Sequence, residues 1–276
     1  MERGAMLRIR KLSVQFGSGE EAVEALKNVN LEVRSGTITA LIGESGSGKS
    51  AAALSVFGLL DRSGRVTAGE VWLDDTDLLR LKPSELRKRR GKDMAMIFQD
   101  PVNALNPVLT IGRQMIETIR GHQRVSRQEA RRIAVEQLAR VGLPEPDKQL
   151  GRYPFQMSGG MCQRVMIALA LVSGARLLIA DEPTTALDVT IQAQILQELN
   201  RLSRQDGIGT LLITHDLSVV AEIADYVYVM KKGRIVETGH VLDIFERPGH
   251  EYTKQLMESR CLRVNPAKET AMRQGG

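Results

Sequence analysis

The sequence predicts an α/β protein whose core carries two additions, a subdomain of antiparallel strands and an inserted block of helices. Short apolar runs of the kind buried inside a sheet, at residues 38–42 and 177–180, alternate with segments of helical periodicity. The first runs, over residues 7–33, follow one another with turn residues at their ends and no helix between them. Over residues 111–141 the apolar residues recur at helical spacing alone, which predicts the inserted helices.

Composition limits the class of protein. The chain has 276 residues, of which 42% are hydrophobic and 26% charged, as is usual for a globular α/β domain. No run approaches the roughly 18 apolar residues that would indicate a membrane span, and the charged first ten residues do not resemble a signal peptide. The two cysteines, Cys162 and Cys261, form no CxxC pair, which argues against a zinc site. We therefore expect a cytoplasmic protein.

The first half of the chain is predicted to be mostly strand. Residues 7–16 alternate with one short shift, residues 26–33 continue in strand fashion, and residues 38–42 form a buried strand. A glycine-rich turn then leads into a helix over residues 49–60, and residues 69–73 and 94–98 are two more predicted strands.

The second half alternates between helices and strands. Ser126 and Glu129 form a capping box that starts the second inserted helix. Further elements are predicted as helices over residues 160–172 and 190–203, strands over 177–180 and 210–213, and a hairpin over 226–237 that turns at Lys231-Lys232-Gly233. We expect one main domain over residues 1–248 with the helical subdomain inserted at about residues 100–168, and a C-terminal extension over 249–276 with one short helix and a disordered end.

A phosphate-binding loop stands between the buried strand and the next helix. Its residues match GxxxxGK[ST] in full: Gly43, Glu44, Ser45, Gly46, Ser47, Gly48, Lys49 and Ser50. Glycines let backbone N–H groups turn toward phosphates, and the helix N-terminus adds partial positive charge. Lys49 is predicted to reach the β- and γ-phosphates, and the Ser50 hydroxyl to ligate Mg²⁺.

Two carboxylates follow the strand at residues 177–180. Ligands in open α/β sheets bind beyond the carboxyl ends of the strands. Asp181 is therefore predicted to hold Mg²⁺, directly or through water, and Glu182 to orient or deprotonate an attacking water. A carboxylate pair of this kind favours hydrolysis over transfer to a second substrate.

Ser158-Gly159-Gly160, followed by Met161-Cys162-Gln163-Arg164, resembles the signature motif of the ABC ATPase family, upstream of the acidic strand as in that family. Further matches come in family order: Phe16 as the adenine-stacking aromatic, Gln99 as the Q-loop glutamine, Ala186-Leu187-Asp188 as the D-loop, and His215 as the switch histidine. Many members have Gln where this chain has Met161, which puts in doubt the surface offered to a partner domain.

The resemblance implies a P-loop NTPase (RecA-like) core that uses ATP and Mg²⁺. It implies catalytic roles for Glu182, His215 and Gln99, and magnesium ligation by Ser50, Gln99 and Asp181. Two such domains would face head to tail, so that each ATP lies between one phosphate loop and the Ser158-Gly159-Gly160 of the other chain, near Asp188. Gly159 and Gly160 at a helix start expose N–H groups on which a γ-phosphate can dock.

Several segments resemble the oligopeptide, dipeptide and nickel importer branch of that family: Phe98-Gln99-Asp100-Pro101, Leu105-Asn106-Pro107, Tyr153-Pro154-Phe155-Gln156-Met157 and His250-Glu251-Tyr252-Thr253. Residues 157–164, and the absence of a C-terminal cysteine cluster, favour nickel or metal-chelate cargo, with dipeptide or oligopeptide cargo as the alternative. The branch implies two permease subunits, a second ATPase chain that is a paralogue rather than an identical copy, an extracytoplasmic binding protein, and a place on the cytoplasmic face of the inner or plasma membrane.

Two other readings stay open at this point. The net charge of +5 and the basic run at residues 87–92 permit a non-transport ABC ATPase that acts on nucleic acid. Such proteins usually carry long coiled coils or zinc modules, and neither heptads nor cysteine pairs are present, so we expect no nucleic-acid partner. An export ATPase of the same fold is the second alternative, against which the importer-branch segments argue.

Overall fold

The structure is a computed structural model that describes residues 5–172, 174–185, 187 and 189–258. The described chain divides into two compact units, one formed by residues up to Leu81 together with those from Gly209 onward, and one formed by Lys82–Ile208. Asp188, Cys261 and the expected disordered end of the chain lie outside the described residues. Each unit is described by itself.

The first unit contains an antiparallel sheet in the order β2-β1-β4-β5. Its strands are β1 (Ala5–Phe16), β2 (Val23–Arg34), β4 (Gly64–Leu73) and β5 (Thr76–Asp77). In β2 the residues Leu26, Val29, Leu31 and Val33 are buried, and between Val29 and Arg34 buried and exposed residues alternate, which is the pattern of a sheet with one solvated face. Register shifts near Lys11 and Leu12 in β1 explain the break in the alternation.

The same unit carries four more strands, with β3 (Ile38–Ile42) parallel to both β8 (Gly209–Thr214) and β9 (Tyr226–Lys231). β10 (Arg234–His240) pairs antiparallel with β9. Every residue of β3 and β8 is buried, as expected for parallel strands covered on both faces. The helices of this unit are α1 (Lys49–Phe57), α9 (Leu217–Ile223), α10 (Val241–Glu246) and α11 (Glu251–Glu258).

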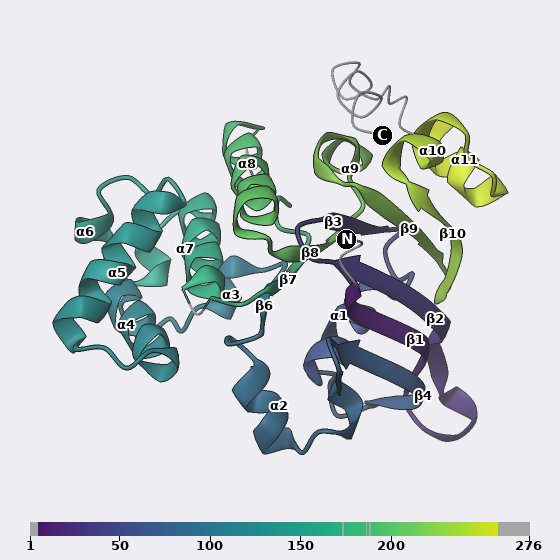
Figure 1. Cartoon of the computed structure of the whole chain (residues 1–276), viewed down its shortest axis with the longest axis horizontal. Helices are drawn as coiled ribbons and strands as arrows, with labels where there is room; N and C mark the ends of the chain where they lie inside the picture. The colour runs from purple at the N-terminus through teal and green to yellow at the C-terminus, as the bar shows by residue number, and fades with distance from the viewer. Residues whose placement is uncertain (1–4, 173, 186, 188, 259–276) are drawn as a thin grey trace. The chain divides into compact units, whose positions relative to one another are not determined.

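The second unit combines two parallel strands, β6 (Met94–Ile97) and β7 (Leu177–Asp181), with helices. The helices are α2 (Pro83–Arg89), α3 (Pro101–Ala104), α4 (Ile111–His122), α5 (Arg127–Arg140), α6 (Pro146–Gln149), α7 (Gly159–Leu171) and α8 (Val189–Asp206). Figure 1 shows α4, α5 and α7 side by side, in teal and green, and these three helices contact one another. The block of helices expected from residues 111–141 is therefore present.

Local signals explain most element ends. Ser126 Oγ accepts the N–H of Glu129 at 3.1 Å and caps α5 as the capping box predicts. The hairpin turns at Lys232 and Gly233, both with positive φ, as a two-residue turn between twisted strands requires. The helix predicted over residues 49–60 ends earlier, at Phe57, because Gly58 adopts the left-handed conformation and caps it.

Five of the described helices carried no clear periodic signal and were not predicted: α2, α3, α6, α9 and α10, which have four to seven residues each. Short helices of this kind depend on their caps and on packing more than on amphipathic pattern. In the part of the chain that the structure describes, no helix is both long enough and apolar enough to cross a membrane.

Candidate functional site

The predicted site residues fall in both compact units, and each group is described within its own unit. The phosphate loop of the first unit, residues 43–48, leaves the buried strand β3 and enters α1. Gly43 and Gly48 have positive φ values of 156° and 109°, and a Cβ on Gly43 would lie 2.2 Å from the carbonyl oxygen of Met230. A Cβ on Gly48 would lie 2.6 Å from the carbonyl oxygen of Ala25. The backbone at Gly43 and Gly48 thus lies directly against β9 and β2. A residue with a Cβ at either position would clash with these strands.

The Lys49 side chain is 6% exposed, and its ammonium donates to the carbonyl oxygens of Gly43 and Glu44, each at 2.9 Å. The lysine therefore folds across the loop that precedes it. The Ser47 Oγ is also buried and has no hydrogen-bond partner among the described residues. A buried cation and a buried hydroxyl in one glycine-lined loop match the donor set that a phosphate requires. The residues present therefore fit a bound nucleotide phosphate.

The β9–β10 turn and the helix α11 both contact the phosphate loop. Gly233 in the β9–β10 turn donates its N–H to Ser47 O at 2.8 Å, and Lys27 donates its N–H to Gly233 O at 2.8 Å. From α11, the buried Tyr252 hydroxyl accepts the N–H of Glu44 at 3.1 Å. Burial raises the pKa of Tyr252, so the hydroxyl stays neutral, and the Lys231 ammonium lies 4.3 Å from the centre of its ring.

His215 and Phe16 are the other predicted site residues of this unit. His215 follows β8, whose last residue Thr214 pairs with Ile42 at the end of β3, so the histidine and the phosphate loop leave neighbouring strands at one edge. The His215 side chain is exposed. Phe16 ends β1 and is half-exposed, and a Cβ on Gly64 would lie 2.7 Å from its ring. The ring thus lies close to the backbone of Gly64, the first residue of β4.

In the second unit, Gln99 and the carboxylates Asp181 and Glu182 lie at one strand edge, because β6 and β7 are parallel with Ile97 opposite Ala180. Asp181 is 5% exposed, whereas Gln99 is exposed. Asp100, next to Gln99, accepts the N–H groups of Val102 and Asn103 and caps α3, and these bonds, that from Asn103 first, hold its pKa below the usual range.

Glu182 has a φ of 50°, in the left-handed region that a non-glycine residue rarely adopts. Its Oε2 accepts the Thr185 hydroxyl at 2.6 Å. Backbone strain of this kind persists where surrounding contacts fix it, and it is commonest at functional sites. The strain and the threonine together set the direction of the Glu182 carboxylate.

The predicted signature residues begin α7. Ser158 caps the helix by accepting the N–H of Met161 at 3.3 Å. Among the described residues, none lies within 4 Å of a Cβ built on Gly159, and the φ of Gly159 is not positive, so neither these neighbours nor the backbone conformation requires a glycine there. Gln163 in the same helix donates to the carbonyl oxygen of Pro183 at 2.7 Å, which ties α7 to the chain after Glu182.

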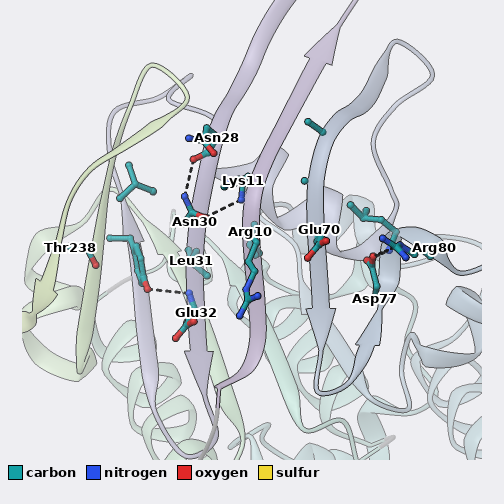
Figure 2. A pocket seen from close by; sticks show the side chains of 16 residues that line it. Arg10, Lys11, Asn28, Asn30, Leu31, Glu32, Glu70, Asp77, Arg80 and Thr238 are labelled. Atoms are coloured by element: carbon teal, nitrogen blue, oxygen red, sulfur yellow. Dashed lines mark hydrogen bonds and ion pairs between the residues drawn. The ribbon is translucent and has the colours of Figure 1, made fainter.

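A separate hollow of about 1020 Å³ lies in the first unit, on a face that includes β1, β2 and β4. Figure 2 shows Arg10, Lys11 and Asn30 pointing into it, with an ion pair between Arg80 and Asp77 at its edge. Charged and amide side chains of both signs line it. No residue predicted for the site lines this hollow.

Tyr252 and Gly233 belong to the phosphate loop's surroundings but were not predicted as part of the site. His250-Glu251-Tyr252-Thr253 was noted only as a segment similar to importer ATPases, and Gly233 only as a turn residue. Their contacts join residues more than 180 positions apart, which no local pattern reveals. Among the described residues there is also no group of three or more His, Cys, Asp or Glu side chains that could hold a metal ion.

Comparison with known proteins places this site in a family. Residues 26–185 match the family described as ABC transporter. A dipeptide transport ATP-binding protein of Haemophilus influenzae is 46% identical over 255 residues, covering 92% of this chain and 77% of the relative. A probable peptide ABC transporter ATP-binding protein of Sinorhizobium fredii is 49% identical, covering 92% and 76%. A glutathione import ATP-binding protein of Escherichia coli O157:H7 is 46% identical, covering 93% of this chain and 42% of the relative.

These relatives are named for dipeptides, peptides and glutathione, so the expected closest similarity to nickel-import ATPases is not supported. Among solved structures, the ATP-binding cassette MJ0796, captured as a dimer in a post-hydrolysis state with ADP and phosphate, superposes with a TM-score of 0.78 at 32% identity over 86% of this chain and 99% of that one. The structure of cbiO1 from Clostridium perfringens gives a TM-score of 0.74 at 25% identity, covering 98% and 99%. The chain belongs to the ABC transporter family and has its ATPase cassette fold, as an ATP-hydrolysing subunit of a transporter.

Proposed function

We propose that this chain is the ATP-hydrolysing motor of a peptide importer. The observation that carries the motor function is the phosphate loop, in which the buried Lys49 ammonium and the buried Ser47 hydroxyl stand inside a turn that only glycines can form. The cargo assignment follows the names of the relatives, which refer to transport or import of dipeptides, peptides and glutathione. The matches to these relatives cover 92–93% of this chain. Peptide cargo therefore replaces nickel as the main hypothesis.

On the nucleotide side, residues 43–50 would wrap the phosphates of ATP. Lys49 would turn its ammonium from the Gly43 and Glu44 carbonyls toward the β- and γ-phosphates, because a charged phosphate oxygen is the stronger acceptor. The half-exposed ring of Phe16, which lies close to Gly64, would stack on adenine.

Ser50, Gln99 and Asp181 would hold Mg²⁺ together with phosphate oxygens. Mg²⁺ in such sites takes one or two protein carboxylates and completes its shell with water and phosphate, so a dense acidic cluster is not required. Ser50 is exposed on the first turn of α1, and Asp181 ends the buried strand β7. When bound, the ion would bridge and neutralise phosphate oxygens.

Glu182 would orient the attacking water and accept its proton. Its carboxylate is fixed by the Thr185 hydroxyl and by its strained backbone, which keeps it in one direction before the substrate arrives. His215, exposed beside the end of β3, would contact the γ-phosphate, and Gln99 would sense its presence. These three residues are the proposed catalytic set.

Ser158, Gly159 and Gly160 would bind the ATP held by a second chain. The open space around Gly159 supports this role, because a glycine that nothing in its own chain requires leaves room for an approaching ligand. The N-terminus of the thirteen-residue helix α7 would favour the negative phosphate. Asp188 would contribute to the same interface. We propose a paralogous second ATPase chain, as in the importers that this sequence resembles.

Two permease subunits would receive the conformational change that ATP binding and hydrolysis produce in this chain. Exposed apolar side chains close to Gln99 support a docking surface there: Phe98, Val102 and Val108 are 38%, 46% and 76% exposed. Such a contact would place the chain on the cytoplasmic face of the membrane, with an extracytoplasmic binding protein delivering the cargo. We also propose that residues 1–248 act as the ATPase domain, with the helical subdomain at about residues 100–168 and an extension from residue 249.

Uptake by living cells tests the proposal. We expect deletion of the gene to abolish uptake of a labelled dipeptide and to leave labelled nickel uptake unchanged. Wild-type complementation should restore peptide uptake, and Lys49→Ala should not. Loss of nickel uptake alone would contradict the peptide assignment, and normal uptake of both would contradict the importer function itself.

A further inference from the structure

Two basic segments of the second unit take no part in the site described above. The first, residues 87–92, contains Arg87, Lys88, Arg89, Arg90 and Lys92. The second, residues 118–128, contains Arg120, His122, Arg124 and Arg127. Neither segment contains an aspartate or a glutamate. Both are therefore sources of positive charge that the ATPase chemistry does not use.

The fold brings the two segments together. Gly91 has a φ of 78°, and a Cβ built on it would lie 2.4 Å from Nε2 of His122, so the Gly91 backbone lies directly against the imidazole at the end of α4. Arg120 and Arg124 are each two residues from His122, and their Cα atoms therefore lie within about 7 Å of its Cα. We call Arg87, Lys88, Lys92, Arg120 and Arg124 the basic patch; all five are exposed.

Nearby acidic side chains are already engaged. Glu85 accepts the N–H of Lys82 at 2.9 Å, and Asp93 pairs with Arg89 at 2.8 Å. On the helical side, Glu117 pairs with Arg113 and Glu129 with Arg132. Burial first, and then the charge of the neighbouring Arg87, lowers the pKa of the half-buried Arg90.

The chemistry of the patch argues against a protein or nucleic-acid partner. Protein interfaces are built around buried apolar or aromatic anchors, and single-stranded nucleic acid is held by aromatic stacking. Among the described residues, the large exposed hydrophobic side chains are Val23, Leu59, Phe98, Val102, Val108, Phe155 and Val189, and none falls in either basic segment. Charge without an apolar anchor suits a surface that attracts by electrostatics alone.

We propose that the basic patch binds the anionic phospholipid headgroups of the membrane. The inference rests on the proposed function, in which the chain works beside membrane-embedded permeases. The patch adds an attraction that is independent of the permease contact and raises the local concentration of the chain at the bilayer.

The test is binding of the purified full-length chain to vesicles of phosphatidylcholine alone and of phosphatidylcholine mixed with phosphatidylglycerol. The patch variant carries Arg87→Gln, Lys88→Gln, Lys92→Gln and Arg120→Gln. The control variant loses the same charge from the same unit through Arg113→Gln, Arg131→Gln, Arg132→Gln and Lys148→Gln, four side chains that are each ion-paired to a carboxylate.

We expect wild type to bind only the vesicles that contain phosphatidylglycerol, and added salt to release it. One basic residue near an anionic surface is worth about fivefold in partitioning, so the patch variant should bind at least about tenfold more weakly. The control variant should change by less than about threefold, because its cations are already neutralised by partners.

Equal loss in both variants would overturn the proposal, since net charge rather than the patch would then explain the binding. So would equal binding of wild type to both kinds of vesicle, or a patch variant that keeps its vesicle binding and no longer co-purifies with its permeases. ATP hydrolysis, measured on the same preparations, should be unchanged by either variant. A wild-type chain that binds through the patch and hydrolyses no ATP would overturn the proposed function and leave the lipid assignment standing.

Discussion

The buried ammonium of Lys49 is stabilised by the loop that is proposed to bind the phosphates of ATP. A buried ammonium is costly unless hydrogen bonds compensate the lost water, and here two main-chain carbonyls of the residue's own loop provide them. Both of these acceptors are neutral carbonyls, and a charged phosphate oxygen is a stronger acceptor than a carbonyl. We therefore expect the ammonium to turn toward a phosphate when one binds.

Lys49→Ala should abolish this property. We expect ATP hydrolysis to fall by about a hundredfold or more, because an electrostatic donor to the reacting phosphates is removed. The free energy of unfolding should change by only about 1–3 kcal/mol, since the Gly43 and Glu44 carbonyls lose a donor. Steady-state hydrolysis and chemical denaturation measure the two effects, with the exposed Lys254→Ala as control. Unchanged turnover would remove the phosphate-loop assignment.

Gly159 offers a test that separates folding from function. Because a Cβ there meets none of the described residues within 4 Å, Gly159→Ala should leave the chain as stable as wild type or stabilise it by up to about 1 kcal/mol through helix propensity. ATP hydrolysis should nevertheless fall at least about tenfold if a phosphate from a second chain docks there. Gly121→Ala in α4, where a Cβ also meets nothing, is the matched control. Full activity in both variants would show that the start of α7 is not a docking site.

At the scale of elements, parallel strands decide which loops meet. Thr214 opposite Ile42 brings His215 to the edge where the phosphate loop begins, and Ile97 opposite Ala180 does the same for Gln99 and the Asp181–Glu182 pair. α11 adds a support from the end of the chain, since Tyr252 accepts the N–H of Glu44. The helix α11, which follows the last strand, thus supports the phosphate loop between β3 and α1.

Tyr252→Phe tests the hydrogen bond by which α11 supports the phosphate loop. Removal of the hydroxyl should cost about 0.5–1.5 kcal/mol of unfolding free energy and weaken ATP binding a few-fold, because Glu44 is no longer held. Tyr228→Phe is a matched control: its hydroxyl also accepts a backbone N–H at 3.1 Å, from Glu32, and burial raises its pKa in the same way. Both variants should lose similar stability in thermal unfolding. Equal ATP affinity in the two would show that α11 does not affect the phosphate loop.

Much of this arrangement could be predicted from local patterns. The buried runs at residues 38–42 and 177–180 became β3 and β7, the Ser126 cap was confirmed, and the phosphate loop lies between strand and helix as its motif requires. These features are encoded by a few neighbouring residues each. The family and fold followed from the order of the motifs and are confirmed by the comparisons.

Other features had no local signal. The contact of Gly91 with His122 and the bond from Glu44 to Tyr252 join distant segments, and the packing of the whole chain decides them. The cargo could not be derived either, since the side chains of an ATPase subunit do not touch it, and the similarity of residues 157–164 to nickel ATPases was misleading. The roles assigned to individual site residues stay predictions.

At the scale of the whole molecule, the proposed active site is complete only when two chains meet. Glu182→Gln keeps the size of the side chain and one of its two acceptor oxygens but cannot accept a proton, so hydrolysis should fall by about 10²–10⁴-fold while ATP still binds. Mixed with its paralogous partner chain, the variant should then accumulate as an ATP-bound dimer in light scattering, whereas the wild-type pair should return to monomers. Adding Lys49→Ala to the same variant is the control, because without ATP binding by this chain the dimer should form far less. A Glu182→Gln chain that stays monomeric at saturating ATP in the presence of the partner chain would contradict the two-chain site.

Gly233 lies in no recognised motif, yet it carries the N–H that holds Ser47 O and approaches Ala25 so closely that a Cβ would lie 2.6 Å from its carbonyl oxygen. Any side chain at this hairpin turn would press against β2 at Ala25 and Leu26, so the turn would have to move and its N–H would no longer hold Ser47 O. In a survey of natural variants, substitutions at Gly233 should therefore be as rare, and as damaging to growth on the transported nutrient, as substitutions within the loop itself. The positions that tolerate no substitution would thus include a turn almost two hundred residues after the phosphate loop in the sequence.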